Sequence, residues 1–320
     1  MNKSGVTGKF KAGVGNDAGL FAVRENEYEK VSVATVCGNE KGVALLAFAR
    51  ACNSLAASFG KPEYAALSLT FPENTKEDII KETLDEAVFA AKKAGVKIVS
   101  GNTITAGVME TVVTVTAFGN EVSPMAPEAA VAVCPDEGTT NYLMMAGFAG
   151  CAGTSMLARE YKEEIHARYT YEFIEKAEKM CEDIFTAGAA QILAGNGITL
   201  MHDVSEGGVF GAIWELLERL SLGAEIKLPL IPIRQETVEI TEFFDVNPYQ
   251  LRGDGGLVFI CSNPDEIKED LKEAGFFAET IGLITAGNDR VLVNGEDKRY
   301  LEPNRTDDYY VAKGGRRRTE

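Results

Sequence analysis

The sequence predicts a two-domain protein of the α/β (α+β) class. Its 320 residues exceed the usual size of a single domain. Short β-branched runs alternate with longer amphipathic stretches in both halves, a pattern typical of mixed strands and helices. Pro124 and Pro127 interrupt this pattern near the middle. We therefore expect one domain over residues 1–125, a second over 126–310, and a disordered basic tail over 311–320.

In the first half, β-branched or apolar runs predict strands. These runs occupy residues 31–36, 65–71, 96–99 and 110–118. Helical spacing of apolar residues predicts two helices between them, over residues 42–59 and 75–94. The second helix begins with acids, ends with lysines and is followed by Gly95, which suits the helix dipole and a glycine C-cap.

The second half continues with the same two kinds of pattern. Strands are predicted at residues 141–146, 256–261, 279–284 and 290–293. Helices are predicted at residues 153–160, 168–193, 205–220, 236–244 and 265–274. Ser205 is the expected N-cap of the helix that follows it, because a serine hydroxyl accepts hydrogen bonds from the first turn.

Composition narrows the possible function classes. The formal charge of −16 argues against nucleic acid, whose phosphates require a basic surface. No run approaches the roughly 20 apolar residues of a membrane span, and no apolar signal core follows Met1, so a cytoplasmic protein is expected. Six isolated cysteines indicate buried thiols rather than disulfides or zinc ligands.

The stretch from Met201 to Gly208 combines acidic residues with glycines. His202 and Asp203 end an apolar run, and Glu206, Gly207 and Gly208 begin the next helix. An acid at a strand end, ahead of a helix N-terminus, is suitable geometry for an anion or its metal. The alternative is that the acid and Ser205 cap the helix while the glycines allow close packing.

Three other short segments carry similar but weaker signals. Gly15, Asn16 and Asp17 lie in a glycine-rich loop that could cradle phosphate or form a turn before a strand. The Gly101-Asn102-Thr103 step after the strand at 96–99 is equally ambiguous. Cys151 at a helix start could have a lowered thiol pKa or be a buried small side chain.

These motifs together resemble a known superfamily. It includes aminoimidazole ribonucleotide (AIR) synthase, selenophosphate synthetase, thiamine-monophosphate kinase and the hydrogenase-maturation carbamoyl dehydratase; the likeness is to the AIR-synthase-related, hydrogenase-maturation-like branch. The resemblance extends from about Gly13 to Tyr310. It rests on residues 201–212, 231–240, 247–249, 287–292 and 301–303, and in the first half on 53–57, 61–62 and 101–103.

The resemblance implies a fold, a cofactor and a set of site residues. An N-terminal domain would supply strands to a dimeric β-barrel, with a C-terminal domain packed beside it. ATP with Mg²⁺ would lie in the cleft between the domains, often completed by the partner subunit. His202 and Asp203 would be catalytic, and Asp17 and Asn102 would bind the metal. The nucleotide would be bound by Gly15, Asn16, Asp17, Asn53, Gly101, Asn102, Thr103, Glu206, Gly207 and Gly208.

Several acids of the family pattern are replaced in this chain. Asn16-Asp17 keeps one acid of a pair, residues 32–37 contain none, and Asn53-Ser54 and Gly101-Asn102-Thr103 lack the expected aspartate. Losing carboxylates removes the negative charge on which Mg²⁺ binding depends. The resemblance therefore implies either a weakened ATP-dependent acceptor activation or phosphoryl transfer, or an inactive nucleotide-binding subunit. Such a chain would form a homodimer or pair with an intact paralogue.

Overall fold

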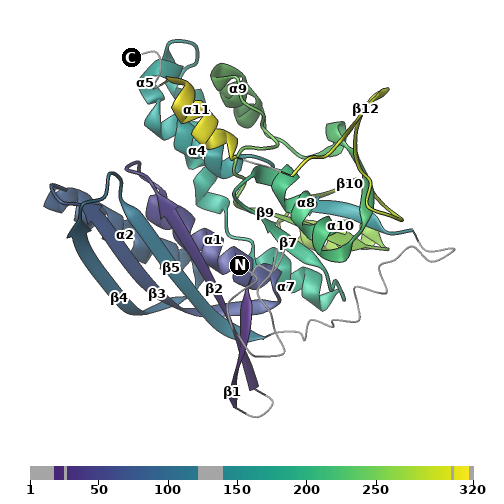
Figure 1. Ribbon diagram of the computed structural model, residues 1–320, viewed down its shortest axis with the longest axis horizontal. Coiled ribbons are helices and arrows are strands. Elements are labelled where there is room, and N and C mark those ends of the chain that lie inside the picture. The colour runs from purple at the N-terminus through teal and green to yellow at the C-terminus, as the bar shows by residue number, and fades with distance from the viewer. Residues whose placement is uncertain (1–17, 25–26, 122–139, 304–305, 317–320) are drawn as a thin grey trace.

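The computed structural model describes residues 18–24, 27–121, 140–303 and 306–316. Two β-sheets, one in each half of the chain, lie on either side of a group of helices (Figure 1). The mixed α/β architecture predicted from the sequence is confirmed. The predicted boundary at residues 125 and 126 falls outside the described residues.

The first half forms a five-stranded sheet with strand order β1-β2-β5-β3-β4. Its strands are β1 (Gly19–Arg24), β2 (Glu27–Cys37), β3 (Gly60–Pro72), β4 (Lys97–Ala106) and β5 (Val112–Glu121). Only β3 and β4 pair in parallel, and helix α2 (Glu77–Ala94) makes the crossover between them. Helix α1 (Val43–Ala57) packs on one face of this sheet, where alternate strand residues are buried.

The second half forms a seven-stranded sheet with order β12-β11-β8-β10-β6-β9-β7. Its strands are β6 (Tyr142–Ala146), β7 (Met201–Val204), β8 (Gly223–Lys227), β9 (Gly256–Cys261), β10 (Ala278–Thr285), β11 (Arg290–Asn294) and β12 (Asp297–Tyr300). Its helices are α4 (Cys151–Glu160), α5 (Lys162–His166), α6 (Tyr171–Lys179), α7 (Ala187–Gly195), α8 (Gly208–Leu220), α9 (Gln235–Phe244), α10 (Pro264–Glu273) and α11 (Asp308–Arg316). In the part of the chain that the structure describes, no helix combines the length and hydropathy needed to cross a membrane.

Helix α1 lies between the two halves and is buried around almost its whole circumference. Its alanine-rich sequence permits this, because small side chains let a sheet and neighbouring helices approach from several sides. Apolar residues of α1 share one buried cluster with the first sheet and with α4, and another with α7 and β9. The two halves are therefore joined through a continuous core rather than through a thin linker.

Two polar side chains of α1 reach into the second half. The Arg50 guanidinium donates to both carboxylate oxygens of Asp254, at 3.1 Å each. The Asn53 amide donates to the Ile184 carbonyl at 2.7 Å and accepts from the Thr186 N–H at 2.9 Å. All of these groups are buried, so the bonds form in a low-dielectric interior where an unpaired group would be costly.

The Asn53 bonds explain why the helix predicted over residues 168–193 is wrong. The chain forms α6, a 3-10 turn over Met180–Asp183 and then α7. The Thr186 N–H is bonded to Asn53 rather than to a carbonyl one helical turn earlier. A tertiary hydrogen bond therefore interrupts a stretch whose periodicity alone favours one continuous helix.

The start of α8 differs from the expectation that Ser205 caps it. Gly207 is the N-cap, with a left-handed φ of 85°, and Gly208 follows with φ of 66°. A Cβ on Gly208 would lie 2.5 Å from the Tyr249 carbonyl oxygen. Backbone conformation favours glycine at both positions, and the close approach of a neighbouring loop requires it at Gly208.

Two further expectations about local structure are corrected. Gly101, Asn102 and Thr103 do not follow a strand but lie inside β4, paired with β3. The tail expected to be disordered from residue 311 is helical up to Arg316, because Tyr309 and Ala312 of α11 are buried against the core. Hydrophobic packing of two side chains from one short helix overrides its low intrinsic stability.

The Arg50–Asp254 bond gives a direct stability prediction. Replacing Asp254 with Ala leaves a buried guanidinium without its bidentate partner, which costs about 3–5 kcal/mol of unfolding free energy. Urea denaturation measures this loss. The matched control is Glu242→Ala, which removes an exposed carboxylate 3.1 Å from Arg168 and should change stability far less, because solvent screens an exposed ion pair. Equal losses in the two variants would contradict the structural role of this bond.

Candidate functional site

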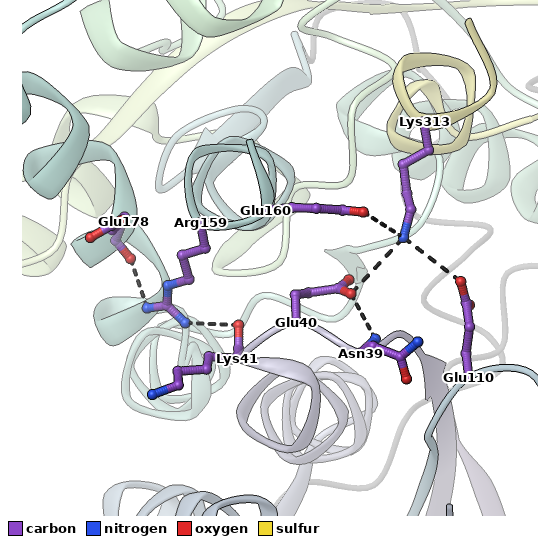
Figure 2. A pocket seen from close by; sticks show the side chains of 8 residues that line it. All are labelled: Asn39, Glu40, Lys41, Glu110, Arg159, Glu160, Glu178 and Lys313. Atoms are coloured by element: carbon purple, nitrogen blue, oxygen red, sulfur yellow. Dashed lines mark hydrogen bonds and ion pairs between the residues drawn. The ribbon is translucent and has the colours of Figure 1, made fainter. Parts of the chain in front are cut away.

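A charged cleft lies where the loop after β2 meets α4 and the C-terminal helix α11. The cavity measures about 730 Å³. Figure 2 shows side chains from both halves of the chain pointing toward one another across it. Its lining is almost entirely polar and consists of Asn39, Glu40, Lys41, Glu110, Arg159, Glu160, Glu178 and Lys313.

Three carboxylates surround the ammonium group of Lys313. The Lys313 Nζ lies 3.2 Å from Glu160, 3.9 Å from Glu40 and 3.9 Å from Glu110 (Figure 2). The Tyr309 hydroxyl has one hydrogen to donate and lies within hydrogen-bond distance of two carboxylates, Glu40 and Glu160, the latter at 3.1 Å. Burial and these two carboxylates raise the pKa of Tyr309 far above its ordinary value, so the hydroxyl stays a neutral donor. The ion pairs of Lys313 and the hydrogen bonding of Tyr309 therefore hold α11 against the cleft.

A second charged group surrounds Arg252, whose side chain is only 1% exposed. Its Nη2 lies 3.3 Å from Glu206 and its Nε 3.7 Å from Asp307. The guanidinium also lies over the rings of Tyr309 and Tyr310, at 4.3 and 4.8 Å from their centroids. This combination of carboxylates and aromatic faces holds an arginine in one orientation.

Arg50 joins this second group from the side of α1. Its Nη1 lies 3.7 Å from Glu206, and it is bonded to Asp254 as described above. The charge of Asp203 also acts on it, and these carboxylates raise the pKa of Arg50 against the opposing effect of burial. Two buried arginines therefore share the carboxylate of Glu206, the residue before the N-cap of α8.

The chain's own carboxylates already occupy two helix N-termini near the cleft. Asp307 accepts a hydrogen bond of 2.7 Å from the Gly207 N–H at the start of α8. Glu86 accepts from backbone N–H groups at the start of α1, while burial raises the pKa of Glu86. A helix N-terminus favours negative charge, and here that charge comes from within the chain.

The structure brings together five of the residues predicted from the sequence. His202 and Asp203 end β7, and Glu206, Gly207 and Gly208 lead directly into α8. The negative charges of Asp203 and Glu206 both raise the pKa of Arg50. The His202 Nε2 lies 2.9 Å from Glu215 Oε2, on the helix that follows. None of these five residues lines the cavity of Figure 2; Glu206 and Gly207 line a smaller neighbouring cavity of about 350 Å³, together with Asp307 and Tyr310.

The remaining predicted residues lie elsewhere or outside the described part of the chain. Asn53 is buried behind the cleft and has the structural bonds described above; a role in nucleotide binding stays a prediction. Gly101, Asn102 and Thr103 are exposed on β4, the outermost strand of the first sheet. Gly15, Asn16 and Asp17 lie outside the described residues.

Sequence patterns alone missed the cations that organise this site. Arg50 had a usable signal, because it is the single charge within the long apolar stretch from Gly42 to Phe59. Arg252 and Asp254 belong to a loop that predicts only a tight turn. Asp307 and Lys313 carry no local signal, since their roles follow from where α11 docks.

The structure also bears on two expectations from the sequence, the state of Cys151 and the presence of a metal site. Burial raises the pKa of Cys151 to about 12, so the buried-thiol alternative holds and an activated thiolate does not. Among the residues that the structure describes, no three His, Cys, Asp or Glu side chains have the geometry of a metal site. Asp17, one of the two Mg²⁺ ligands that the resemblance implies, lies outside the described residues, so the implied metal site stays a prediction.

Comparison with known proteins identifies relatives of both halves. The chain is 26% identical over 208 residues to carbamoyl dehydratase HypE of Rhodobacter capsulatus. That match covers 64% of this chain, and the chain spans 58% of the length of that relative.

Solved structures show the same fold. The structure of a HypE–HypF complex matches with a TM-score of 0.70 at 16% identity, covering 90% of this chain and 93% of that chain. The structure of HypE in complex with ATP matches with a TM-score of 0.67 at 15% identity, covering 92% of this chain and 90% of that chain.

The family comparison covers both halves of the charged cleft. Residues 15–120 match the family described as AIR synthase related protein, N-terminal domain, and residues 141–294 match its C-terminal domain. The chain therefore belongs to the AIR synthase related protein family.

Proposed function

We propose that this protein binds ATP in the cleft between its two halves, as an AIR-synthase-related, hydrogenase-maturation-like protein. The observation that carries the proposal is the pair of buried arginines, Arg50 and Arg252, at the first turn of α8. In a chain with a net charge of −16, two buried cations beside a helix N-terminus form a local anion-binding environment. The similarity to a HypE structure solved with ATP supports the choice of anion.

Binding requires the nucleotide phosphates to replace internal carboxylates. Asp307 bonds to Gly207 at the start of α8, and Glu206 lies between the two arginines. A phosphate offers the same negative charge with more acceptor oxygens, and arginine recognises it in a bidentate manner. Movement of α11 away from the cleft would release Asp307 and open the cavity of Figure 2.

The chemistry that this site would support is acceptor activation or phosphoryl transfer at a low rate. Such reactions depend on positioning and on neutralising phosphate charge. The arginines can provide part of that charge, and bound Mg²⁺ would add Lewis-acid stabilisation. Asp17 and Asn102 remain the proposed metal ligands, and we derive no step through the metal. His202 and Asp203 remain the proposed catalytic residues, and a cytoplasmic location remains part of the proposal.

ATP titration by calorimetry, with and without Mg²⁺, tests the proposed binding. We expect saturable binding, weakened at least about tenfold by Arg252→Met, since a charge-assisted bond contributes about 1.5–3 kcal/mol. The matched control is Arg168→Met. Arg168 is exposed and pairs with Glu242 of α9, so its replacement should leave ATP binding unchanged.

A second variant covers the case in which Arg252→Met does not fold. Glu206→Gln removes one negative charge from a side chain that is half exposed, so we expect tighter ATP binding. Absence of saturable ATP binding in the folded wild-type chain would contradict the proposal. Unchanged affinity in Glu206→Gln would place the nucleotide away from this cleft.

A second candidate function is that of a partner subunit, and an exposed apolar surface favours it. Large apolar side chains lie open on the strands and on α2 of the first half. Among them are Val33, Tyr64, Ile79, Val88, Phe89, Val99 and Ile104, with 43–62% of each exposed. Val33 lies on the face of the sheet opposite α1, since its neighbours Ser32 and Ala34 are buried, and exposed apolar side chains on an uncovered sheet face favour an interaction surface. Pairing there would also give the exposed Gly101–Thr103 segment of β4 a place beside a second subunit.

Light scattering coupled to size exclusion tests the pairing. We expect a dimer for the wild-type chain and a monomer for Val33→Glu, because a buried, unpaired carboxylate opposes association. Val238→Glu is the matched control: this valine is 38% exposed on α9, outside the first half, and its replacement should leave the dimer intact. A monomeric wild-type chain would leave a different protein as the only possible partner on this surface, and so would refute a homodimer.

A further inference from the structure

A second cavity, of about 610 Å³, lies on another side of the same interface between the two halves. It shares no lining residue with the cavity of Figure 2. The end of α2, the loop between β6 and α4, the start of α7 and the loop before β9 all contribute to it. Of the side chains that line this second cavity, only Asp254 takes part in the proposed ATP site, where it is bonded to Arg50.

Two loops approach each other backbone to backbone in this cavity. Gly147 and Gly255 both line it, with left-handed φ values of 85° and 98°. A Cβ on Gly147 would lie 2.4 Å from the Gly255 carbonyl oxygen. No other residue type fits this close approach, so glycine keeps this part of the wall free of side chains.

Thr186, the N-cap of α7, is a buried donor without a partner. The residue is 4% exposed, lines the cavity, and its hydroxyl oxygen makes no hydrogen bond within the described chain. Its N–H is already bonded to Asn53. The first turn of the nine-residue helix α7 contains no acid, so its N–H groups are not neutralised by a carboxylate of that turn. A buried hydroxyl beside a helix N-terminus points to an anionic ligand with acceptor oxygens.

Cations surround this cavity, and two of them lack a carboxylate partner. Lys93 lies 3.9 Å from Asp183, and Lys176 lies 3.1 Å from Glu172. Lys179 and Arg234 make no ion pair with any carboxylate that the structure describes. The lining acids are Glu182, Asp183 and Asp254, of which Asp254 is bonded to Arg50.

An aromatic stack orients one of these unpaired cations. The Arg234 guanidinium lies 4.6 Å from the centroid of the Phe148 ring, and Phe148 stacks on Phe277 at 5.1 Å. All three residues line the cavity. Arg234 is therefore placed at the cavity by packing, with its charge still available to a ligand.

We propose that this cavity binds the phosphoryl group of a small organic phosphate at the start of α7. The Thr186 hydroxyl and the N–H groups of the first turn would donate to the phosphoryl oxygens, and Lys179 and Arg234 would balance the charge. A phosphoryl group has enough acceptor oxygens to satisfy donors from several directions, whereas a carboxylate has two. This site is separate from the proposed ATP cleft and does not depend on it.

Titration with inorganic phosphate and with glycerol 3-phosphate, followed by calorimetry, tests the site. We expect saturable binding of both, with glycerol 3-phosphate binding more tightly; tighter binding of inorganic phosphate would contradict an organic phosphate as the ligand. Thr186→Val keeps the shape of the side chain and should weaken binding about tenfold, because one hydrogen bond to a charged group is lost. Lys179→Met combined with Arg234→Met should weaken it further. Lys272→Met on α10, which is outside the lining, is the matched control and should have no effect.

Two readouts separate this site from the ATP cleft and from a folding defect. Thr186→Val should be at least as stable as the wild type in urea, since it removes a buried hydroxyl without a partner. Arg252→Met and Glu206→Gln should leave phosphate affinity unchanged, and saturating ATP should not displace the bound phosphate. Loss of phosphate binding in Arg252→Met but not in Thr186→Val would overturn the proposal, as would the absence of saturable binding.

Discussion

Burial of almost all of helix α1 is the constraint on which the arrangement of this protein depends. A helix with apolar contacts on all sides cannot leave a polar side chain without a partner. Arg50 and Asn53 find their partners in loops of the second half, at Asp254 and at the segment from Ile184 to Thr186. Together with the shared apolar core, these bonds hold the two halves against each other. They also place α1 between two charged regions, since Asn53 holds the start of α7 on one side while Arg50 approaches Glu206 on the other.

Carboxylates of the chain itself neutralise the positive charge in and around the cleft. Asp307 and Glu86 occupy two helix N-termini, and three glutamates surround Lys313. The cleft is thus close to charge balance without any ligand. A nucleotide must exchange with these groups rather than enter a vacant positive pocket, so affinity depends on how readily α11 leaves. The start of α7 differs, because its first turn contains no acid and its capping hydroxyl is unbonded.

The sequence predicts most elements correctly where a local pattern determines them. Helix α2 is an example, with acids in its first turn, lysines in its last and Gly95 in the left-handed conformation at its C-cap. The pattern fails where tertiary contacts decide: the Asn53 bond interrupts residues 168–193, and packing of Tyr309 and Ala312 orders α11. For the site, the glycines and acids near His202 direct attention to the segment between β7 and α8, and their role in binding stays a prediction. Arg252, Asp307 and Lys313 were not predictable, since their partners come from distant parts of the chain.

A crystal structure with a non-hydrolysable ATP analogue would show directly whether the buried arginines bind the nucleotide. We expect the triphosphate to lie against Arg50, Arg252 and the first turn of α8, with Asp307 no longer bonded to Gly207. An analogue found elsewhere, or bound while Asp307, Tyr309 and Lys313 keep their present contacts, would contradict it.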